Sequence, residues 1–327
     1  MNIEDVLRDT LADMAHEEPP PPPGRFLRAA ASRPRAVRPG GMALAAAAAV
    51  AVLAAGTVVA VRGLSDERLA PSVSSGPMTR ATGEISANAE RGRAVVVTMK
   101  EGLRLADVLR RLAEATGIPL QEFERAARNG AALGLPSYAN GSLEGFASPA
   151  IYEVGPGRSA ERILADMVGM HRATADQLGL VEGARRLGRS PRDIMIVASI
   201  VQAESVSREE MPKVARTIYN RLDHRPPMKL QMDSPLLYAL GKYSVEASRE
   251  DLKSRSRYNT YRYKGLPPAP INNPGRDAIE AALQPATGSW LYYVTVDPKT
   301  GATKFARSGA EFEQLIAERE KNIRAGS

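Results

Sequence analysis

Cysteine is absent from the 327 residues of the chain, which excludes disulfides, thiol nucleophiles and thiolate metal sites. Histidine is scarce, and His16, His171 and His224 lie too far apart in sequence to form a recognisable metal-ligand spacing. Aromatic residues make up only 5% of the chain, whereas a protein that binds nucleic acid by base stacking usually has more of them among its basic residues. We therefore expect no metal, no cofactor and no nucleic-acid partner.

Basic residues outnumber acidic ones, and the formal net charge is +7. This balance suits an anionic partner such as phospholipid headgroups or an acidic cell-wall polymer, but it is equally compatible with plain solubility. Apolar residues make up 43% of the chain, enough to form a core. The length fits two modest domains with additional tails.

The one long uncharged segment is residues 42–61, MALAAAAAVAVLAAGTVVAV. As a helix, about 20 residues span the ~30 Å hydrocarbon core of a bilayer. We predict a transmembrane helix at 42–62, with a buried soluble helix as the alternative. Five arginines precede the segment, and the charges after it nearly cancel. The positive-inside tendency then predicts a cytoplasmic tail, 1–41, in a single-pass protein of the cell membrane whose C-terminal bulk is extracytoplasmic.

The remaining N-terminal features are a helical apolar pattern at 3–14 and a segment without periodicity at 63–93, which we interpret as a linker. Beyond the linker, the patterns predict a strand, two short helices and a second strand between 94 and 155. Further helices are expected at 159–180, 191–206, 212–224, 275–284 and 309–323. A strand at 290–296 is expected to pair with 303–307. Residues 225–275 are rich in Pro, Gly, Asn and Tyr and predict long ordered loops, which are often functional.

The helix predicted at 191–206 carries the strongest chemical signal. Ser190, Pro191 and Asp193 match a capping box with proline at the first helical position. At helical spacing, one face is shared by Ile194, Val197, Val201 and Glu204. We expect the Glu204 carboxyl to be partly desolvated, which raises its pKa, and the nearby helix C-terminus also disfavours an anion. A raised pKa suits a general acid near neutral pH, whereas a solvated glutamate at a frayed helix end is the alternative.

Residues 196–205, IVASIVQAES, resemble the A-S-I-V-E-x-E-T signature of the MltG/YceG-like endolytic murein transglycosylases. Glu204 matches the last glutamate of that signature. Gln202 stands where the family has its earlier glutamate, which argues against a role for a carboxylate at this position.

Other segments resemble the same family in the same order, over about 95–320. The matching segments are 142–154 (SLEGFASPAIYEV), 214–222 (VARTIYNRL), 228–240 (MKLQMDSPLLYAL) and 258–285 (YNTYRYKGLPPAPINNPGRDAIEAALQP). The chain departs from the family's usual residues at Ala147, Ala150, Ala269, Lys304, Ser308 and Phe312. The effect of these departures on activity stays open.

The resemblance implies an α+β fold, with a transmembrane helix, a small LysM-like βααβ module at 94–155 and a mixed α/β YceG-like catalytic domain at 156–323. It implies a lyase that cleaves the MurNAc–GlcNAc β-1,4 bond of peptidoglycan and leaves a 1,6-anhydroMurNAc end. One carboxylate, Glu204, can suffice for this reaction, because the C6 hydroxyl of the sugar serves as nucleophile where a hydrolase would usually need two carboxylates. The implied partners are peptidoglycan glycan strands, at the outer face of the cell membrane. The helical pattern at 3–14 separately suggests a contact with peptidoglycan synthases.

The matched motifs also suggest substrate-binding residues. The candidates are Gln231 and Asp233 in LQMD, Asn259 and Tyr261 in YNTY, and Glu144 in LEGF. For Asn259 and its neighbours in the loops, the alternative is a hydrogen bond that only orders the loop. We expect the most informative observation to be whether these side chains line one groove with Glu204.

Three alternatives remain open. Asn220 and Arg221 match the N-R-L part of a family motif, and we favour a structural role for both. The departures from the family pattern leave room for a non-catalytic peptidoglycan-binding scaffold with the same fold. A membrane-tethered regulator or nucleic-acid binder would fit the basic charge, but no recognised nucleic-acid motif is present.

Overall fold

The computed structural model describes residues 94–326. The predicted tail at 1–41, transmembrane helix at 42–62 and linker at 63–93 lie outside the described residues, as does the segment 3–14. Within 94–326, no helix has both the length and the apolar character that a membrane crossing requires.

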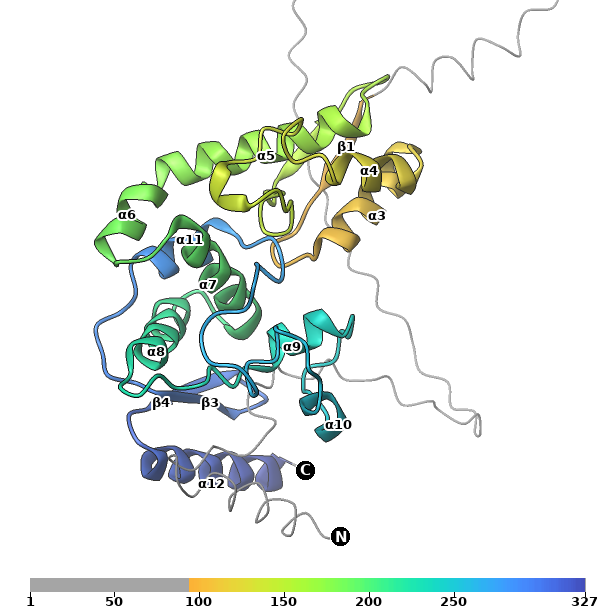
Figure 1. The fold of residues 1–327 in the computed structure, drawn as a ribbon. Coiled ribbons are helices and arrows are strands. Elements are labelled where there is room, and N and C mark those ends of the chain that lie inside the picture. Colours follow the sequence, from red (N-terminus) through yellow and green to blue (C-terminus); the bar gives the residue numbers. More distant parts are fainter. Residues whose placement is uncertain (1–93, 327) are drawn as a thin grey trace, which may run out of the picture. The chain divides into compact units, whose positions relative to one another are not determined.

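The described part is mainly helical and contains two small antiparallel sheets, which confirms the coarse prediction of mixed helices and strands (Figure 1). The strands are β1 (Val95–Thr98), β2 (Ile151–Val154), β3 (Tyr292–Asp297) and β4 (Ala302–Ala306). The helices are α3 (Leu105–Thr116), α4 (Leu120–Ala127), α5 (Ala160–Gln177), α6 (Leu180–Arg186), α7 (Pro191–Glu204), α8 (Met211–Asp223), α9 (Asp233–Ala239), α10 (Arg249–Leu252), α11 (Arg276–Leu283) and α12 (Gly309–Gly326), with a 3₁₀ turn at Ser137–Ala139.

The first sheet joins the two ends of the segment 94–155. β1 and β2 pair antiparallel, with Val95 opposite Val154, and α3 and α4 lie between them in the chain. The predicted order of strand, two helices and strand is therefore confirmed. Helix α3 ends at Gly117, whose φ of +72° a residue with a side chain rarely adopts. One buried cluster contains both Leu112 of this segment and Ile200 of the segment after 155.

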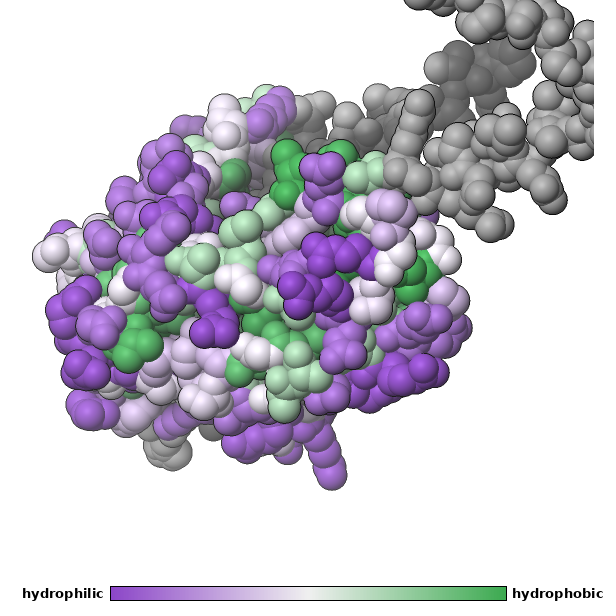
Figure 2. Space-filling model, turned by 90° about the horizontal axis from the view of Figure 1, so that it is seen from above, coloured by the Kyte–Doolittle hydropathy of each residue, from purple (hydrophilic) through white to green (hydrophobic). Residues whose placement is uncertain are grey.

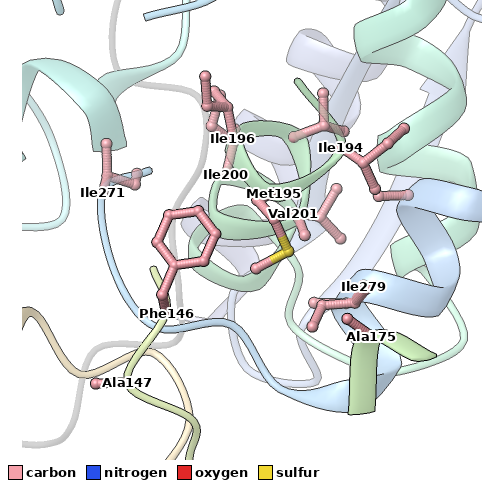
Figure 3. Close-up of a cluster of buried hydrophobic side chains, with 14 of the residues drawn as sticks. Phe146, Ala147, Ala175, Ile194, Met195, Ile196, Ile200, Val201, Ile271 and Ile279 are labelled. Atoms are coloured by element: carbon pink, nitrogen blue, oxygen red, sulfur yellow. The ribbon is translucent and has the colours of Figure 1, made fainter. Parts of the chain in front are cut away.

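Helix α7 lies at the centre of the described fold and contacts α6, α8, α9 and α11 (Figures 1 and 3). Its N-terminus has the predicted capping box, formed by Ser190 and Asp193, with Pro191 at the first position. Because neighbours surround the helix, apolar side chains on several faces are buried. Figure 3 shows Ile194, Met195 and Ile200 of α7 in this core, with Phe146 and Ile279 from other segments.

The second sheet is the predicted hairpin of β3 and β4, which α12 covers (Figure 1). Phe312 of α12 is buried and stacks on Tyr292 of β3, with ring centroids 5.1 Å apart. Lys304 of β4 forms a salt bridge of 2.7 Å with Glu318 of α12. Two departures from the family pattern thus help to join α12 to the hairpin.

The structure contains short helices in two regions, 159–180 and 225–275, where the sequence predicted a single long helix and long loops, respectively. The helix predicted at 159–180 ends earlier, and Gly179, at a φ of +60°, starts the separate helix α6. Helices α9 and α10 lie within the predicted loops of 225–275. A capping box of Ser248 and Asp251 starts α10, but its single turn is too short for an apolar repeat to reveal it. Over the face seen in Figure 2, hydrophilic residues cover most of the surface, with smaller hydrophobic areas between them.

Candidate active site around Glu204

Glu204 is the last residue of α7, and its side chain is only 8% exposed. The backbone turns to an extended conformation at Ser205 and ends the helix there. The Ser234 amide donates to Glu204 Oε1 at 3.4 Å, and the Tyr293 phenol donates to Oε2 at 3.2 Å. The predicted desolvation of this carboxyl is confirmed.

Burial raises the pKa of Glu204 from its usual 4.5 to about 7. The negative charge of Asp233 raises the pKa further, while the hydrogen bonds from Ser234 and Tyr293 oppose both effects. A carboxyl with a pKa near 7 is present in both protonation states at neutral pH. It can therefore donate a proton in one step and accept one in the next.

Asp233 begins α9 and is also buried, at 2% exposure. Its Oδ1 accepts a hydrogen bond of 2.7 Å from the phenol of Tyr261. Asp233 is also the residue before Ser234, whose amide contacts Glu204. The fold therefore brings Glu204, Asp233 and Tyr261 together from three separate segments.

Gln231 precedes Asp233 by two residues and has an unusual backbone, with a φ of +51°. Non-glycine residues seldom adopt this region, and those that do often lie at functional sites. Its Oε1 accepts a hydrogen bond of 3.1 Å from Arg221 Nη1. The same guanidinium donates to the carbonyls of Lys229, Leu230 and Leu291. Arg221 thus joins the segment before α9 to the residue that precedes β3.

Asn259 is fully buried and orders its own loop. Its Nδ2 donates to the carbonyls of Leu252 and Ser254, at 2.9 and 2.8 Å, and its Oδ1 accepts from the Tyr261 amide at 3.1 Å. The geometry gives Asn259 the loop-ordering role that the sequence left as an alternative. Through these bonds it helps to place Tyr261 beside Asp233.

Glu144 lies in a different environment from Glu204. Its carboxylate accepts from the Leu105 amide at 3.0 Å and from the Tyr238 phenol at 3.0 Å. Burial raises its pKa to about 7, against the hydrogen bonds from Leu105 and Tyr238. Its hydrogen bonds go to the start of α3 and to the end of α9, and none joins it to Glu204, Asp233 or Tyr261.

The proline-rich segment after the YNTY loop is fixed against α7. The Asn272 side chain donates to the Ser199 carbonyl at 2.8 Å, and the Ile271 amide donates to Ser199 Oγ at 3.1 Å. Gly145 lies against the same segment, where a Cβ would come within 2.5 Å of Pro270. Gln202, which replaces the family's first glutamate, accepts from the Gly275 amide at 2.8 Å and so has a structural contact.

Two residues at the site, Ser234 and Tyr293, were not identified from the sequence, and both bond the Glu204 carboxyl directly. The hydroxyl of Ser205, which follows Glu204 in the matched motif, is buried and has no hydrogen-bond partner among the described residues. Tyr293 lies in a strand buried on both faces, so no alternation of polar and apolar residues marks it. Ser234 follows the candidate Asp233 directly, and this adjacency was the only available signal. Within 94–326, no cluster of three or more His, Asp or Glu side chains could hold a metal ion.

Comparison with known proteins supports the sequence resemblance. The endolytic murein transglycosylase of Bacillus subtilis (strain 168) is 34% identical over 154 residues, covering 46% of this chain and 41% of that protein. The endolytic murein transglycosylase of Streptococcus pneumoniae (strain ATCC BAA-255 / R6) is 29% identical over 182 residues, covering 54% of this chain and 32% of that protein. In both comparisons, less than half of the relative's own length is matched.

A crystal structure of a putative YceG-like protein from Listeria monocytogenes has a similar fold, with a TM-score of 0.61 at 26% identity. The match covers 72% of this chain and 81% of that structure. The profile of the YceG-like family matches residues 53–318. The family predicted from the motifs is confirmed: this chain belongs to the YceG-like family.

Proposed function

We propose that this protein is a membrane-anchored endolytic peptidoglycan transglycosylase with Glu204 as its acid/base. The observation that carries the proposal is the buried Glu204 carboxyl, with a pKa of about 7, beside Asp233 and Tyr261. Family membership and the names of the two relatives support the same activity. The substrate is the glycan strand of peptidoglycan, cut at the MurNAc–GlcNAc β-1,4 bond.

In the first step, protonated Glu204 gives its proton to the glycosidic oxygen, and the bond from that oxygen to C1 of MurNAc breaks. In the second step, the C6 hydroxyl of the same MurNAc attacks C1, and the Glu204 carboxylate takes the hydroxyl proton. The products are a strand with a free GlcNAc hydroxyl and a strand with a 1,6-anhydroMurNAc end. Glu204 is protonated again after each cycle.

The neighbouring groups can assist both steps. Positive charge develops at C1 as the bond breaks, and the Asp233 carboxylate is a nearby negative group that can stabilise it. Hydrogen bonds from Ser234 and Tyr293 favour the ionised form of Glu204 once its proton has been transferred. These hydrogen bonds limit the rise in the pKa of Glu204, so that its carboxylate can act as the base in the second step.

The proximity of a second carboxylate favours a second candidate reaction, hydrolysis of the same bond. Glycosidases that use water usually have two carboxyl groups, one as acid and one to activate the water. Asp233 could take the second role beside Glu204. The products differ, because hydrolysis leaves a reducing MurNAc end and intramolecular attack leaves an anhydro end.

The test compares the unmutated protein with Glu204→Gln on purified sacculi, followed by mass spectrometry of the released ends. The substitution keeps the size of the side chain and removes the acid, so we expect release of anhydro-muropeptides to stop. Glu209→Gln is the matched control, since Glu209 is fully exposed five residues away. Undiminished release by Glu204→Gln would refute the role of Glu204, and reducing ends from the unmutated protein would favour hydrolysis.

A protein that binds sacculi but releases no soluble product would instead be a scaffold. The surroundings of Glu204 argue against this alternative, because its raised pKa occurs beside a second carboxylate, Asp233, and coupled, perturbed groups of this kind cluster at catalytic sites. The retention of unmutated protein on sacculi without products is the result that would favour the scaffold.

The proposal includes the predicted organisation of the chain: a cytoplasmic tail at 1–41, a transmembrane helix at 42–62, a LysM-like module at 94–155 and a catalytic domain at 156–323. The antiparallel β1–β2 pair with two helices between its strands supports the LysM-like module. Protease added to intact spheroplasts should digest the part after residue 62 and leave the tail protected. Peptidoglycan synthases are the partners proposed for 3–14, and unchanged recovery of synthases after deletion of residues 2–18 would refute that contact.

A further inference from the structure

The loop that carries Asn259 and Tyr261 is strongly basic. Residues 253–264 contain five cationic side chains and no carboxylate: Lys253, Arg255, Arg257, Arg262 and Lys264. In the part of the chain that the structure describes, Arg255, Arg257 and Arg262 have no carboxylate within salt-bridge distance. The loop therefore has positive charge that ion pairs in the described fold do not neutralise.

Part of this charge surrounds a pocket of about 270 Å³. The lining residues are Arg257, Thr260, Tyr263, Lys264, Gly265, Leu266, Pro267 and Pro268, and none of them is acidic. The Arg257 guanidinium lies over the Tyr263 ring, 4.6 Å from its centroid. Arg192 Nη2 donates to the carbonyl of Pro268, another lining residue, at 2.9 Å. A cation-π contact and a hydrogen bond from outside the pocket thus involve three of the lining residues.

A second feature concentrates positive charge at the same place. Lys229 and Lys264 face each other in an isolated antiparallel β-bridge. Residues directly opposite in such a pair have Cβ atoms about 5 Å apart, which places the two cationic side chains next to each other on one face. Arg257 offers a planar fork of donors and Lys264 a compact charge, and this pair of groups suits a carboxylate or a phosphate.

The pocket is connected to the site around Glu204 through the backbone of the loop. Thr260 lines the pocket, and its Oγ1 donates to the Met232 carbonyl and accepts from the Met232 amide, at 2.7 and 2.8 Å. Met232 directly precedes Asp233, and Tyr261, which donates to Asp233, directly follows Thr260. A polymer bound near Asp233 can therefore carry a substituent into the pocket.

We propose that this pocket binds an oxyanion, a carboxylate or a phosphate, carried by the glycan strand that Glu204 acts on. This inference rests on the proposed function for the identity of the polymer. A carboxylate would come from a peptide attached to the glycan, and a phosphate from a phosphate-containing polymer linked to it. The pocket would then select glycan strands that carry that anion.

The experiment measures binding, so that its result does not depend on cleavage. The full chain with Glu204→Gln is cosedimented with purified sacculi, alone and with Arg257→Gln and Lys264→Gln added. Because Arg257 and Lys264 are both exposed, loss of their two charged contacts should weaken binding about tenfold. The matched control adds Arg249→Gln and Lys253→Gln, which remove the same charge from exposed positions at α10 outside the pocket. Circular dichroism checks that each variant is folded.

Two treated substrates distinguish the sources of the anion. If the pocket binds a carboxylate, removing the attached peptides with an amidase should abolish the difference between the pocket variant and its parent. If it binds a phosphate, stripping phosphate-containing polymers should abolish the difference. Equal binding of both proteins to intact sacculi would overturn the proposal, as would an equal loss in the control variant or a difference that survives both treatments.

The binding result is separable from the proposed activity. Selective weakening by the pocket variant, together with no product release by the unmutated protein, would support the pocket and refute the enzyme. Equal binding together with normal product release would refute the pocket and leave the enzyme intact.

Discussion

The phenol oxygen of Tyr293 lies 3.2 Å from Oε2 of Glu204, and both side chains are buried. This hydrogen bond joins the last residue of α7 to strand β3 across 89 residues of sequence. It lowers the pKa of Glu204, against the larger effect of burial. Tyr293 is therefore a group through which the fold adjusts the acid/base proposed for the reaction.

Tyr293→Phe should raise the pKa of Glu204, because it removes a donor to the ionised carboxyl. Activity that requires protonated Glu204 is expected to fall above pH 7 in the unmutated protein. In the variant, this fall should move to higher pH by about half a unit to one unit, the equivalent of one hydrogen bond. The pH profile of product release checks the direction, and a shift to lower pH would contradict it.

Asp233→Asn should have the opposite effect on Glu204. The Asp233 charge raises the pKa of Glu204, so its removal lowers that pKa and moves the fall in activity to lower pH. The asparagine Oδ1 can still accept from Tyr261, which keeps that contact. We expect a further loss in kcat, since the variant lacks the carboxylate proposed to stabilise the positive charge that develops at C1. A profile identical to that of the unmutated protein would exclude an electrostatic role for Asp233.

Glu144→Gln should change how stability depends on pH. The folded-state pKa of Glu144 is about 7, above its usual 4.5, so the folded protein holds this proton more tightly than the unfolded chain. The bound proton contributes up to about 3 kcal/mol to the free energy of unfolding. This contribution is fully present below pH 4.5 and is lost as the pH rises through 7.

The variant has no such titration at 144, so its loss of stability between pH 5 and pH 8 should be smaller than that of the unmutated protein. Urea unfolding at the two pH values measures this difference. Glu204→Gln should also reduce the loss of stability between pH 5 and pH 8, because the pKa of Glu204 is also raised to about 7. If Glu144→Gln lost as much stability between pH 5 and pH 8 as the unmutated protein, burial would not raise the pKa of Glu144.

Arg221→Lys should destabilise the protein by about 2–4 kcal/mol, because one ammonium group cannot reach the four acceptors that the guanidinium holds. Those acceptors belong to the segments that carry Ser234 and Tyr293, so activity should fall with stability. Arg216→Lys is the matched control on α8, since within residues 94–326 the Arg216 side chain donates only to the Ala286 carbonyl. Urea unfolding and product release, measured together, check the prediction; similar losses in both variants would show that Arg221 has no special role.

The sequence alone determined helix α7 and the environment of its last residue. Ser190, Pro191 and Asp193 specify where the helix begins, and the apolar repeat specifies that Glu204 shares a buried face. The sequence also predicted the hairpin of β3 and β4, because turn residues separate two segments with the composition of strands. These features depend on residues near one another in sequence, and for that reason a pattern can predict them.

Only the tertiary structure decided which candidates meet Glu204. Asp233 and Gln231 belong to one motif, yet Asp233 contacts Tyr261 while Gln231, at a positive φ, accepts from Arg221. Asn259 orders its loop, Glu144 joins α3 to α9, and Tyr293 reaches the carboxyl from a strand with no polar pattern. Local periodicity fixes which face of an element is buried. The contacts between distant elements are set by how their side chains pack, and no short stretch of sequence contains that information.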